Sequence, residues 1–339
     1  MTRLSCTWAV LAAGRIMVKW LLGLVALLGL VAAAFFASPW PGVLIIRAIF
    51  DRGAATASDR LQDIVPPEVT TTTIPYDPGD DSAVLDIYRL PGAAPDLPVV
   101  VWVHGGGFVS GRRGDVANYL KILAGRGITV VNVDYTIAPN ATYPAPVRQV
   151  TQALAHLVEA QDRLGLDASR IVLAGDSAGA QIAAQTAAVL SNPDYADLVG
   201  VPRDGSPIRI AGALLFCGVY DMREMGRDGG FLGWFVHTAG WAYSGTRNWR
   251  EDPGFASINF LPHLPPAFPP AFISAGNADP LEGQSRALAD ALDAQGVAVE
   301  RLFFPPDHQP PLGHEYQFDL TTEAGAEAFE RAVDWLSQL

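Results

Sequence analysis

Apolar and polar positions alternate along most of this chain with two different periods. From residue 69 onward, short apolar runs have the character of strands, and those from 98 onward are continuous, as in strands buried on both faces. Stretches with helical periodicity separate these runs. The pattern predicts a single α/β domain, in which a mostly parallel sheet is wrapped by helices on both faces. The predicted strands are 69–76, 83–90, 98–104, 127–135, 170–175, 208–218, 271–276 and 298–304, and the predicted helices lie around 115–126, 145–163, 177–190, 282–295 and 322–338.

A different hydrophobic pattern occupies the N-terminal region. Residues 20–37 contain no charge, and a helix of that length can cross the hydrocarbon core of a bilayer. Because Arg3, Arg15 and Lys19 precede it, we expect a cytoplasmic tail at 1–16, a transmembrane anchor at 17–37 and the remainder of the chain outside the cytoplasm. The alternative is a signal peptide cleaved near 32–34, which would give a secreted protein.

The segment 38–68 connects the anchor to the α/β domain, which we expect to span 69–339. Its apolar stretch at 43–50 predicts a short amphipathic helix, followed by a polar connection from 51 to 68. Such a helix would lie on the membrane surface or form part of a cap over an active site.

Composition narrows the possible functions. Charged residues make up only 17% of the chain and the net charge is −12, with no basic stripe, which argues against a nucleic-acid partner. Cys6 lies before the apolar segment and Cys217 lies in an apolar strand-like run, which favours inert thiols over a disulfide or a metal site. We therefore expect no metal and no organic cofactor.

The strongest chemical signal is the sequence Gly175-Asp176-Ser177-Ala178-Gly179, which follows an apolar strand and opens an alanine-rich helix. A G-x-S-x-G nucleophile elbow needs this strand–turn–helix context, because the turn is too sharp for side chains beside the serine. Ser177 would adopt a strained backbone conformation with its hydroxyl exposed above the sheet. A glycine-rich turn with an incidental serine would look the same in isolation, so the motif needs partners elsewhere in the chain.

A second glycine-rich motif, His104-Gly105-Gly106-Gly107, follows the predicted strand 98–104. Consecutive glycines allow backbone N–H groups to approach a substrate oxygen, and donors aimed at a developing oxyanion usually contribute the largest single catalytic effect in acyl transfer. We expect an oxyanion hole from the N–H groups of Gly106, Gly107 and Ala178, with Gly105 shaping the loop. His104 would brace the loop through hydrogen bonds.

Together the motifs resemble the hormone-sensitive-lipase branch of the α/β-hydrolase fold, which combines HGGG, GDSAG and an Asp-Pro-Leu acid motif. The segment 134–146 is similar to that branch's D-Y-R-L-A-P…P-x-P pattern, except that Thr136 and Asn140 replace its arginine and glutamate. The resemblance covers roughly residues 69–339. It implies an esterase with a loose cap domain and leaves the substrate open.

In this fold the acid and the base follow the serine in that order. Asp279, in Asp279-Pro280-Leu281, follows an apolar strand and matches the branch's acid motif, although an Asp there could also cap the next helix. Two histidines follow the last strand. His308 has the spacing expected of the base, whereas the local sequence around His314 better matches the branch. We expect His314 as the base, with His308 as the alternative.

The region 220–265 departs from the strand–helix alternation, at a point where this fold carries its lid. Two interpretations stay open: a cap whose aromatic side chains form an acyl-binding wall, or a helical subdomain with ordinary core aromatics. The aromatic residues are Phe231, Trp234, Phe235, Trp241, Tyr243, Trp249, Phe255 and Phe260.

The sequence therefore predicts a serine carboxylic-ester hydrolase, acting through an acyl-enzyme on Ser177, on small-molecule or lipid esters with medium or long acyl chains near a membrane. The same triad also supports an acyltransferase, an amidase or a lactonase. A non-catalytic binding member of the fold is a further alternative.

Overall fold

The computed structural model describes residues 3–92, 97–201 and 208–339, and the side chains before Met17, Cys6 included, lie outside that description. An eight-stranded sheet in the order β1-β2-β4-β3-β5-β6-β7-β8 forms the centre of the molecule. β2 is antiparallel to both neighbours, and every other neighbouring pair is parallel. Each strand lies inside its predicted range, except that β5 ends one residue later. The strands are β1 (Thr70–Pro75), β2 (Val84–Arg89), β3 (Val99–Val103), β4 (Thr129–Val133), β5 (Ile171–Asp176), β6 (Ile210–Phe216), β7 (Ala271–Ala275) and β8 (Val299–Phe303).

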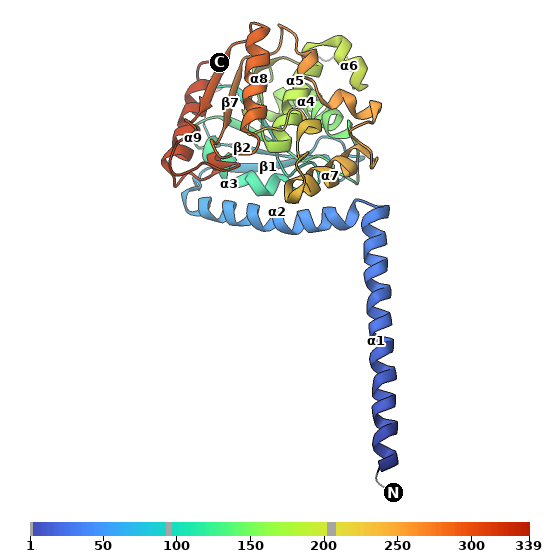
Figure 1. Cartoon of the computed structure of the whole chain (residues 1–339). Helices are drawn as coiled ribbons and strands as arrows, with labels where there is room; N and C mark the ends of the chain where they lie inside the picture. Colours follow the sequence, from blue (N-terminus) through green and yellow to red (C-terminus); the bar gives the residue numbers. More distant parts are fainter. Residues whose placement is uncertain (1–2, 93–96, 202–207) are drawn as a thin grey trace.

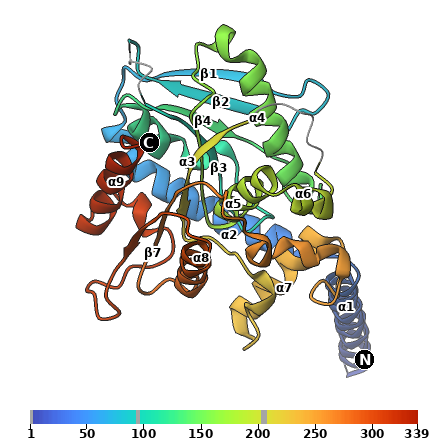
Figure 2. The ribbon, with the colours of Figure 1, turned by 90° about the horizontal axis from the view of Figure 1, so that it is seen from above.

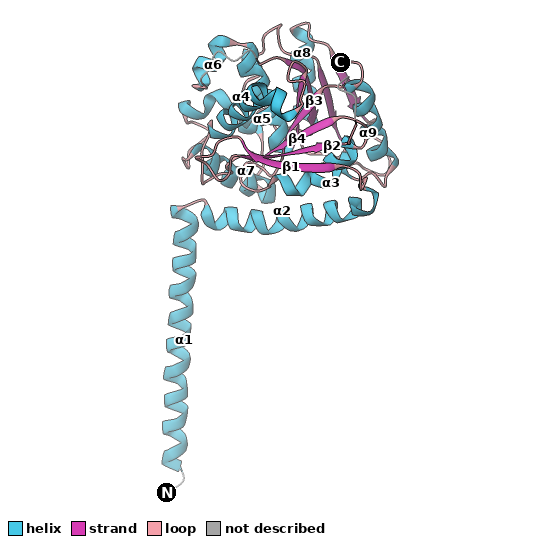
Figure 3. Cartoon of the chain, turned by 180° about the vertical axis from the view of Figure 1, so that it is seen from behind, coloured by secondary structure: helices cyan, strands magenta, loops and turns pink. Residues whose placement is uncertain are grey.

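Helices cover both faces of the sheet, as the alternating pattern predicts (Figures 2 and 3). Along β5, Ile171 and Leu173 belong to the core under α4, α5 and α8, whereas Val172 and Ala174 belong to the core under α3 and α9. This two-sided burial explains why the central strands are apolar throughout. The helices of the domain are α3 (Arg113–Ala124), α4 (Ala145–Leu164), α5 (Ser177–Ser191), α6 (Pro193–Val199), α7 (Gly230–Ser244), α8 (Glu282–Ala294) and α9 (Glu323–Leu336).

Two helices precede the domain. α1 (Arg3–Ala37) extends away from it, and after Ser38 and Pro39 the chain turns so that α2 (Trp40–Leu61) runs along one side of the domain (Figure 1). Within α1, the stretch Lys19–Ala37 is long and apolar enough to cross a membrane, and none of it is buried in the protein. α1 begins at Arg3, so most of the stretch 1–16 expected as an N-terminal tail is helical.

α2 also corrects the sequence analysis, since it continues to Leu61 where a polar connection was expected from residue 51. Gly53 disfavours a helix, and no large apolar residue occurs between Phe50 and Leu61, which favoured a loop. The burial of Val43, Ile46 and Leu61 on one face of the helix overrides that local preference. Val43 and Ile46 join the core on one face of the sheet and Leu61 joins the core on the other. α2 therefore bridges the two cores.

Candidate active site

Ser177 stands at the sharp turn between β5 and α5, in the middle of the sheet. Its φ of +52° lies in the left-handed region, so the strained backbone conformation predicted for it is present. At Gly179 a Cβ would come within 2.1 Å of the carbonyl oxygen of Val103 and 2.4 Å of that of His104. Glycine is required there because the helix begins against the neighbouring strand β3.

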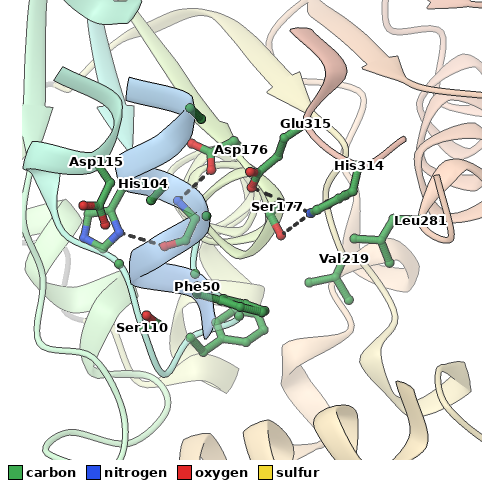
Figure 4. A pocket seen from close by; sticks show the side chains of 18 of the residues that line it. Phe50, His104, Ser110, Asp115, Asp176, Ser177, Val219, Leu281, His314 and Glu315 are labelled. Carbon is green, nitrogen blue, oxygen red and sulfur yellow. Dashed lines mark hydrogen bonds and ion pairs between the residues drawn. The ribbon is translucent and has the colours of Figure 1, made fainter. Parts of the chain in front are cut away.

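The structure brings Ser177, His314 and Asp279 into one hydrogen-bonded chain (Figure 4 shows the first two). His314 Nε2 lies 3.0 Å from Ser177 Oγ, and His314 Nδ1 lies 2.9 Å from Asp279 Oδ2. The Asp279 side chain is fully buried, and its other oxygen, Oδ1, accepts the backbone N–H of Leu281 at 2.7 Å. The carboxylate thus orients the imidazole and also holds the turn before α8.

His308, the alternative base, lies elsewhere. Its ring packs on Phe304, with ring centroids 4.7 Å apart, and its carbonyl oxygen accepts a hydrogen bond from Asn277 Nδ2. Asn277 Oδ1 also accepts the N–H of Leu312, which fixes the loop that carries His314. The proline-rich loop therefore places the later histidine, and not the earlier one, beside Ser177.

The glycine-rich loop after β3 places backbone N–H donors beside Ser177. In the part of the chain that the structure describes, the N–H groups of Gly106 and Gly107 have no protein acceptor, and both residues line the cavity beside Ser177. Their φ angles of +114° and +59° favour glycine. Ala178 lies in the first turn of α5, where N–H groups lack intrahelical acceptors. The N–H of Gly105 is already used, since it donates to Asp176 Oδ2 at 2.9 Å.

Buried polar contacts hold this loop in place. Asp176 accepts from Gly105 N–H and also from Trp102 Nε1, at 2.9 Å each, so one carboxylate ties the loop to two neighbouring strands. Burial, together with the nearby Glu315, raises the pKa of Asp176 well above its usual value. The His104 ring stacks on Tyr135 and bonds to the carbonyl oxygen of Gly105 through Nδ1 at 2.8 Å, and burial lowers its pKa. His104 thus contacts the loop that it was expected to brace.

Charges around His314 tune its protonation. Partial burial of the imidazole disfavours the charged form, but Cys217, the hydrogen bond to Asp279 and the charge of Glu315 act in the opposite direction, and the pKa of His314 is raised above its usual value. Glu315 Oε1 lies 3.7 Å from His314 Nε2 (Figure 4). Because burial raises the pKa of the Cys217 thiol, this thiol is neutral at neutral pH and adds no charge there. Sequence reasoning missed Glu315, although it follows His314 directly.

Cys217, Asp279 and His314 also form the kind of cluster that can hold a metal ion, with one ligand atom of each within 4.8 Å of the others. The raised pKa of the Cys217 thiol disfavours the thiolate that a metal would need. Asp279 already accepts hydrogen bonds from its neighbours, and His314 is engaged at both ring nitrogens. These contacts favour the hydrogen-bonded chain over a metal site.

A cavity of about 430 Å³ opens beside Ser177 and is lined mainly by apolar side chains. α7 contributes Leu232, Phe235, Val236 and Ala239 to its wall. Of the aromatic residues between 220 and 265, Phe235 alone is among the lining residues described, while Tyr243, Trp249, Phe255 and Phe260 are buried in the core. Half of the eight aromatic residues named for this region are therefore core residues, and one lines the cavity.

The opposite wall of the cavity comes from α2, whose apolar stretch at 43–50 the sequence suggested as part of a cap over an active site or as a helix on the membrane surface. Phe50 of α2 packs on Phe235 of α7, with ring centroids 5.4 Å apart, and small residues follow it toward the cavity. The part of α2 after Phe50 was expected as a connection, because no large apolar residue follows until Leu61. The residues of α2 along the cavity are Ile49, Phe50, Gly53, Ala54, Ala57, Ser58 and Leu61.

Comparison with known proteins agrees with this architecture. The sequence pattern of a family described as an alpha/beta hydrolase fold matches residues 100–307, which include Ser177 and Asp279 and end before His314. The carboxylesterase NlhH of Mycobacterium tuberculosis is 32% identical over 298 residues, covering 83% of this chain and 88% of that protein. The esterase LipQ of the same organism is 30% identical over 276 residues, covering 78% of this chain and 61% of that protein.

Solved structures show the same fold. Esterase B from Lactobacillus rhamnosis superposes with a TM-score of 0.74 at 24% identity, covering 88% of this chain and 96% of that one. Esterase LipW from Mycobacterium marinum has a TM-score of 0.67 at 25% identity, covering 87% of this chain and 89% of that one. With its sheet order, its nucleophile turn and its relatives in agreement, this chain belongs to the alpha/beta hydrolase fold family, as its resemblance to the hormone-sensitive-lipase branch implies.

Proposed function

We propose that this protein is a serine carboxylic-ester hydrolase that works through an acyl-enzyme on Ser177. The observation that carries the proposal is the hydrogen-bonded chain from Ser177 Oγ through His314 to Asp279. At its Ser177 end lie the N–H groups of Gly106 and Gly107, which have no acceptor among the described residues. The relatives named carboxylesterase and esterase support ester hydrolysis as the reaction.

In the first half of the reaction, Ser177 Oγ attacks the ester carbonyl carbon while its proton passes to His314 Nε2. The carbonyl oxygen becomes an oxyanion, which the N–H groups of Gly106, Gly107 and Ala178 stabilise. The buried Asp279 carboxylate holds the imidazole in place and stabilises its charged form. His314 then returns the proton to the departing alkoxide, the alcohol leaves, and the acyl group stays on Ser177.

In the second half, a water molecule replaces the alcohol and follows the same steps in reverse. His314 Nε2 takes a proton from the water as its oxygen attacks the acyl carbon, and the same donors stabilise the second oxyanion. The proton is then delivered to Ser177 Oγ as its bond to the acyl carbon breaks. The products are the free carboxylic acid and the regenerated serine.

The cavity supports the proposal that the substrates are esters with medium or long acyl chains. Its walls are apolar side chains from α2 and α7, and its volume of about 430 Å³ has room for an extended acyl chain. The apolar helix Lys19–Ala37 supports a membrane anchor, with the catalytic domain held outside the cytoplasm. A strict preference for acetyl over octanoyl esters would contradict the acyl-chain part of this proposal.

Labelling with a fluorophosphonate and turnover of p-nitrophenyl octanoate test the reaction. We expect the wild-type protein to react with the probe at Ser177 and to release p-nitrophenol. Ser177→Ala should lose both activities while its circular dichroism spectrum is unchanged, and Ser169→Ala, an exposed serine in a loop, serves as the matched control. Wild-type rates in Ser177→Ala would refute the proposal. A second assay adds an alcohol during turnover. If more ester of that alcohol than free carboxylic acid is formed, the protein is an acyltransferase.

A further inference from the structure

Large apolar side chains are exposed in an uneven way on this protein. Beyond the apolar helix α1, eight such residues are exposed in the described part of the chain, and six of them lie on α2 and α7. Contiguous exposed apolar surface is uncommon on soluble proteins and marks a site of interaction. We name the six the α2–α7 face: Trp40, Leu44, Ile45 and Ile49 of α2, and Phe231 and Leu232 of α7, with exposures from 39% to 62%.

The two helices present one continuous surface because they pack against each other. Phe50 contacts Phe235, and a Cβ at Gly42 would lie 2.7 Å from Thr238, so the α2 and α7 backbones approach closely. Both helices lie on the side of the domain from which α1 leaves (Figure 1). The other two exposed apolar residues, Ile64 and Leu198, lie outside these helices.

Part of the mouth of the cavity lies on this same face, and Pro280 and His314, which also line the cavity and are exposed, form another part of it. Ile49 and Gly53 of α2 and Leu232 of α7 line the cavity and are also exposed, so they lie where it meets the surroundings. A Cβ at Gly53 would meet nothing within 4 Å, so no neighbouring side chain fills the space beside this residue. A molecule that enters between the two helices passes directly from the α2–α7 face to Ser177.

The neighbouring α1 indicates what covers this face. Only Ser38 and Pro39 separate the apolar helix from α2, so the α2–α7 face begins where a transmembrane segment would leave the hydrocarbon. At the junction, Arg247 lies over the rings of both Phe36 and Trp241, and Arg47 lies over Trp40. Tryptophan side chains are enriched at the membrane–water interface, and long arginine side chains near the end of a transmembrane helix can reach it.

Charge favours contact with hydrocarbon over attraction to anionic headgroups. The exposed charges of α2, Asp51, Arg52, Asp59 and Arg60, balance one another and lie on its second half, beyond the apolar positions. The whole chain carries a net charge of −12, which opposes adsorption to an anionic surface.

We propose that the α2–α7 face inserts into the outer part of one leaflet of a phospholipid bilayer and opens the cavity mouth to lipid acyl chains. An ester dissolved in the bilayer then enters between Ile49, Gly53 and Leu232 without crossing water. The binding surface is independent of the chemistry at Ser177, whereas its use for substrate entry rests on the ester hydrolysis proposed above.

Fluorescence quenching tests the insertion without reference to activity. The full chain with Cys6→Ser is labelled at Phe231→Cys or, as the matched control on α6, at Leu198→Cys, since Cys217 is buried. In phosphatidylcholine nanodiscs, we expect nitroxide-labelled lipid to quench the label at position 231 and iodide to quench the label at 198. The quenching of the two labels should not change with salt concentration. Equal exposure of the two labels to iodide would overturn the proposal. Shielding of position 231 from both quenchers would also overturn it, by indicating a second copy of the chain or another protein.

Hydrolysis in the same nanodiscs tests substrate entry. Leu44→Ser, Ile45→Ser and Phe231→Ser together remove apolar surface outside the cavity. We expect them to lower turnover of a long-chain fluorogenic ester in the bilayer about tenfold relative to Leu198→Ser, while soluble p-nitrophenyl butyrate is hydrolysed as before. An equal loss on both esters, or no loss on the bilayer ester, would refute entry through this face. If the unmodified protein hydrolysed neither ester, the proposed function would fail while the quenching result stood.

Discussion

Arg47 of α2 donates from Nε to the carbonyl oxygen of Val109 at 2.7 Å, and from Nη2 to that of Ala138 at 3.1 Å. Val109 belongs to the turn that follows the glycine-rich loop, and Ser110 in the same turn donates to Asp51 of α2 at 3.0 Å. The helix that follows the apolar N-terminal segment therefore also holds the loop that presents N–H groups to Ser177.

We expect Arg47→Met to weaken both stability and catalysis. The change removes two hydrogen bonds from a charged donor, and the free energy of unfolding should fall by about 2 kcal/mol. Because the oxyanion donors lose part of their support, kcat should fall by about tenfold with a smaller change in KM. Urea denaturation and steady-state kinetics measure the two effects. Arg52→Met, an exposed position on the same helix, is the control, and equal effects of the two substitutions would contradict the role given to Arg47.

The two histidines of the last loop provide a matched pair. His314→Ala should lower kcat for p-nitrophenyl esters by about 10⁴-fold or more, because the proton of Ser177 loses its acceptor. His308→Ala removes only a ring that packs on Phe304, and we expect kcat within about twofold of the wild type. Stopped assays at saturating substrate distinguish them. A large loss in His308→Ala with little change in His314→Ala would reverse the assignment of the base.

Glu315 should set the acid limit of activity. The base must be neutral to accept the serine proton, so activity falls as pH falls through the pKa of His314, which Glu315 helps to raise. Glu315→Gln removes that negative charge, lowers the pKa and extends activity toward acid, by about 0.5 to 1 pH unit for a partly exposed pair. The pH profile of kcat/KM reports the shift. A displacement toward alkaline pH would show that Glu315 does not stabilise the imidazolium.

Gly53 should control the length of acyl chain accepted. Since Gly53 lines the cavity and a Cβ there meets nothing within 4 Å, we expect Gly53→Trp to be accommodated on α2 and to fill part of the cavity mouth. We expect turnover of dodecanoyl esters to fall about tenfold relative to butyryl esters, because only the longer chain extends to the filled volume. Gly53→Ala is the control and should leave the ratio unchanged while favouring the helix by about 1 kcal/mol. A parallel loss on both esters would indicate a damaged site instead of a narrowed one.

The strands and the nucleophile turn of the catalytic domain could be predicted from the sequence, because the apolar pattern of each strand and the motif that follows it indicate the same local structure. The apolar run before Gly175 and the glycines around Ser177 specify one conformation, and the strands on either side repeat the same pattern. Local composition was misleading for α2, whose second half forms a helix only through its contacts with the domain.

The choice between the two candidate histidines could not be made from local sequence. His308 and His314 belong to one loop, and their order and spacing leave the choice open. Long-range contacts decide between them: Asn277 binds both the carbonyl oxygen of His308 and the N–H of Leu312, which fixes the path of the loop. No periodicity or motif encodes that pair of hydrogen bonds.

The link between α1 and α2 has a kinetic consequence. Ser38 N–H donates to Ala34, and Trp40 N–H donates to the Ser38 hydroxyl, so the junction is ordered and as short as two residues allow. If α1 anchors the protein in a bilayer, as proposed above, Ser177 stays at a nearly constant height above the membrane and meets substrate by lateral diffusion in two dimensions. The rate of hydrolysis then follows the mole fraction of ester among the surrounding lipids. Diluting the suspension with buffer leaves the turnover rate of each enzyme molecule unchanged.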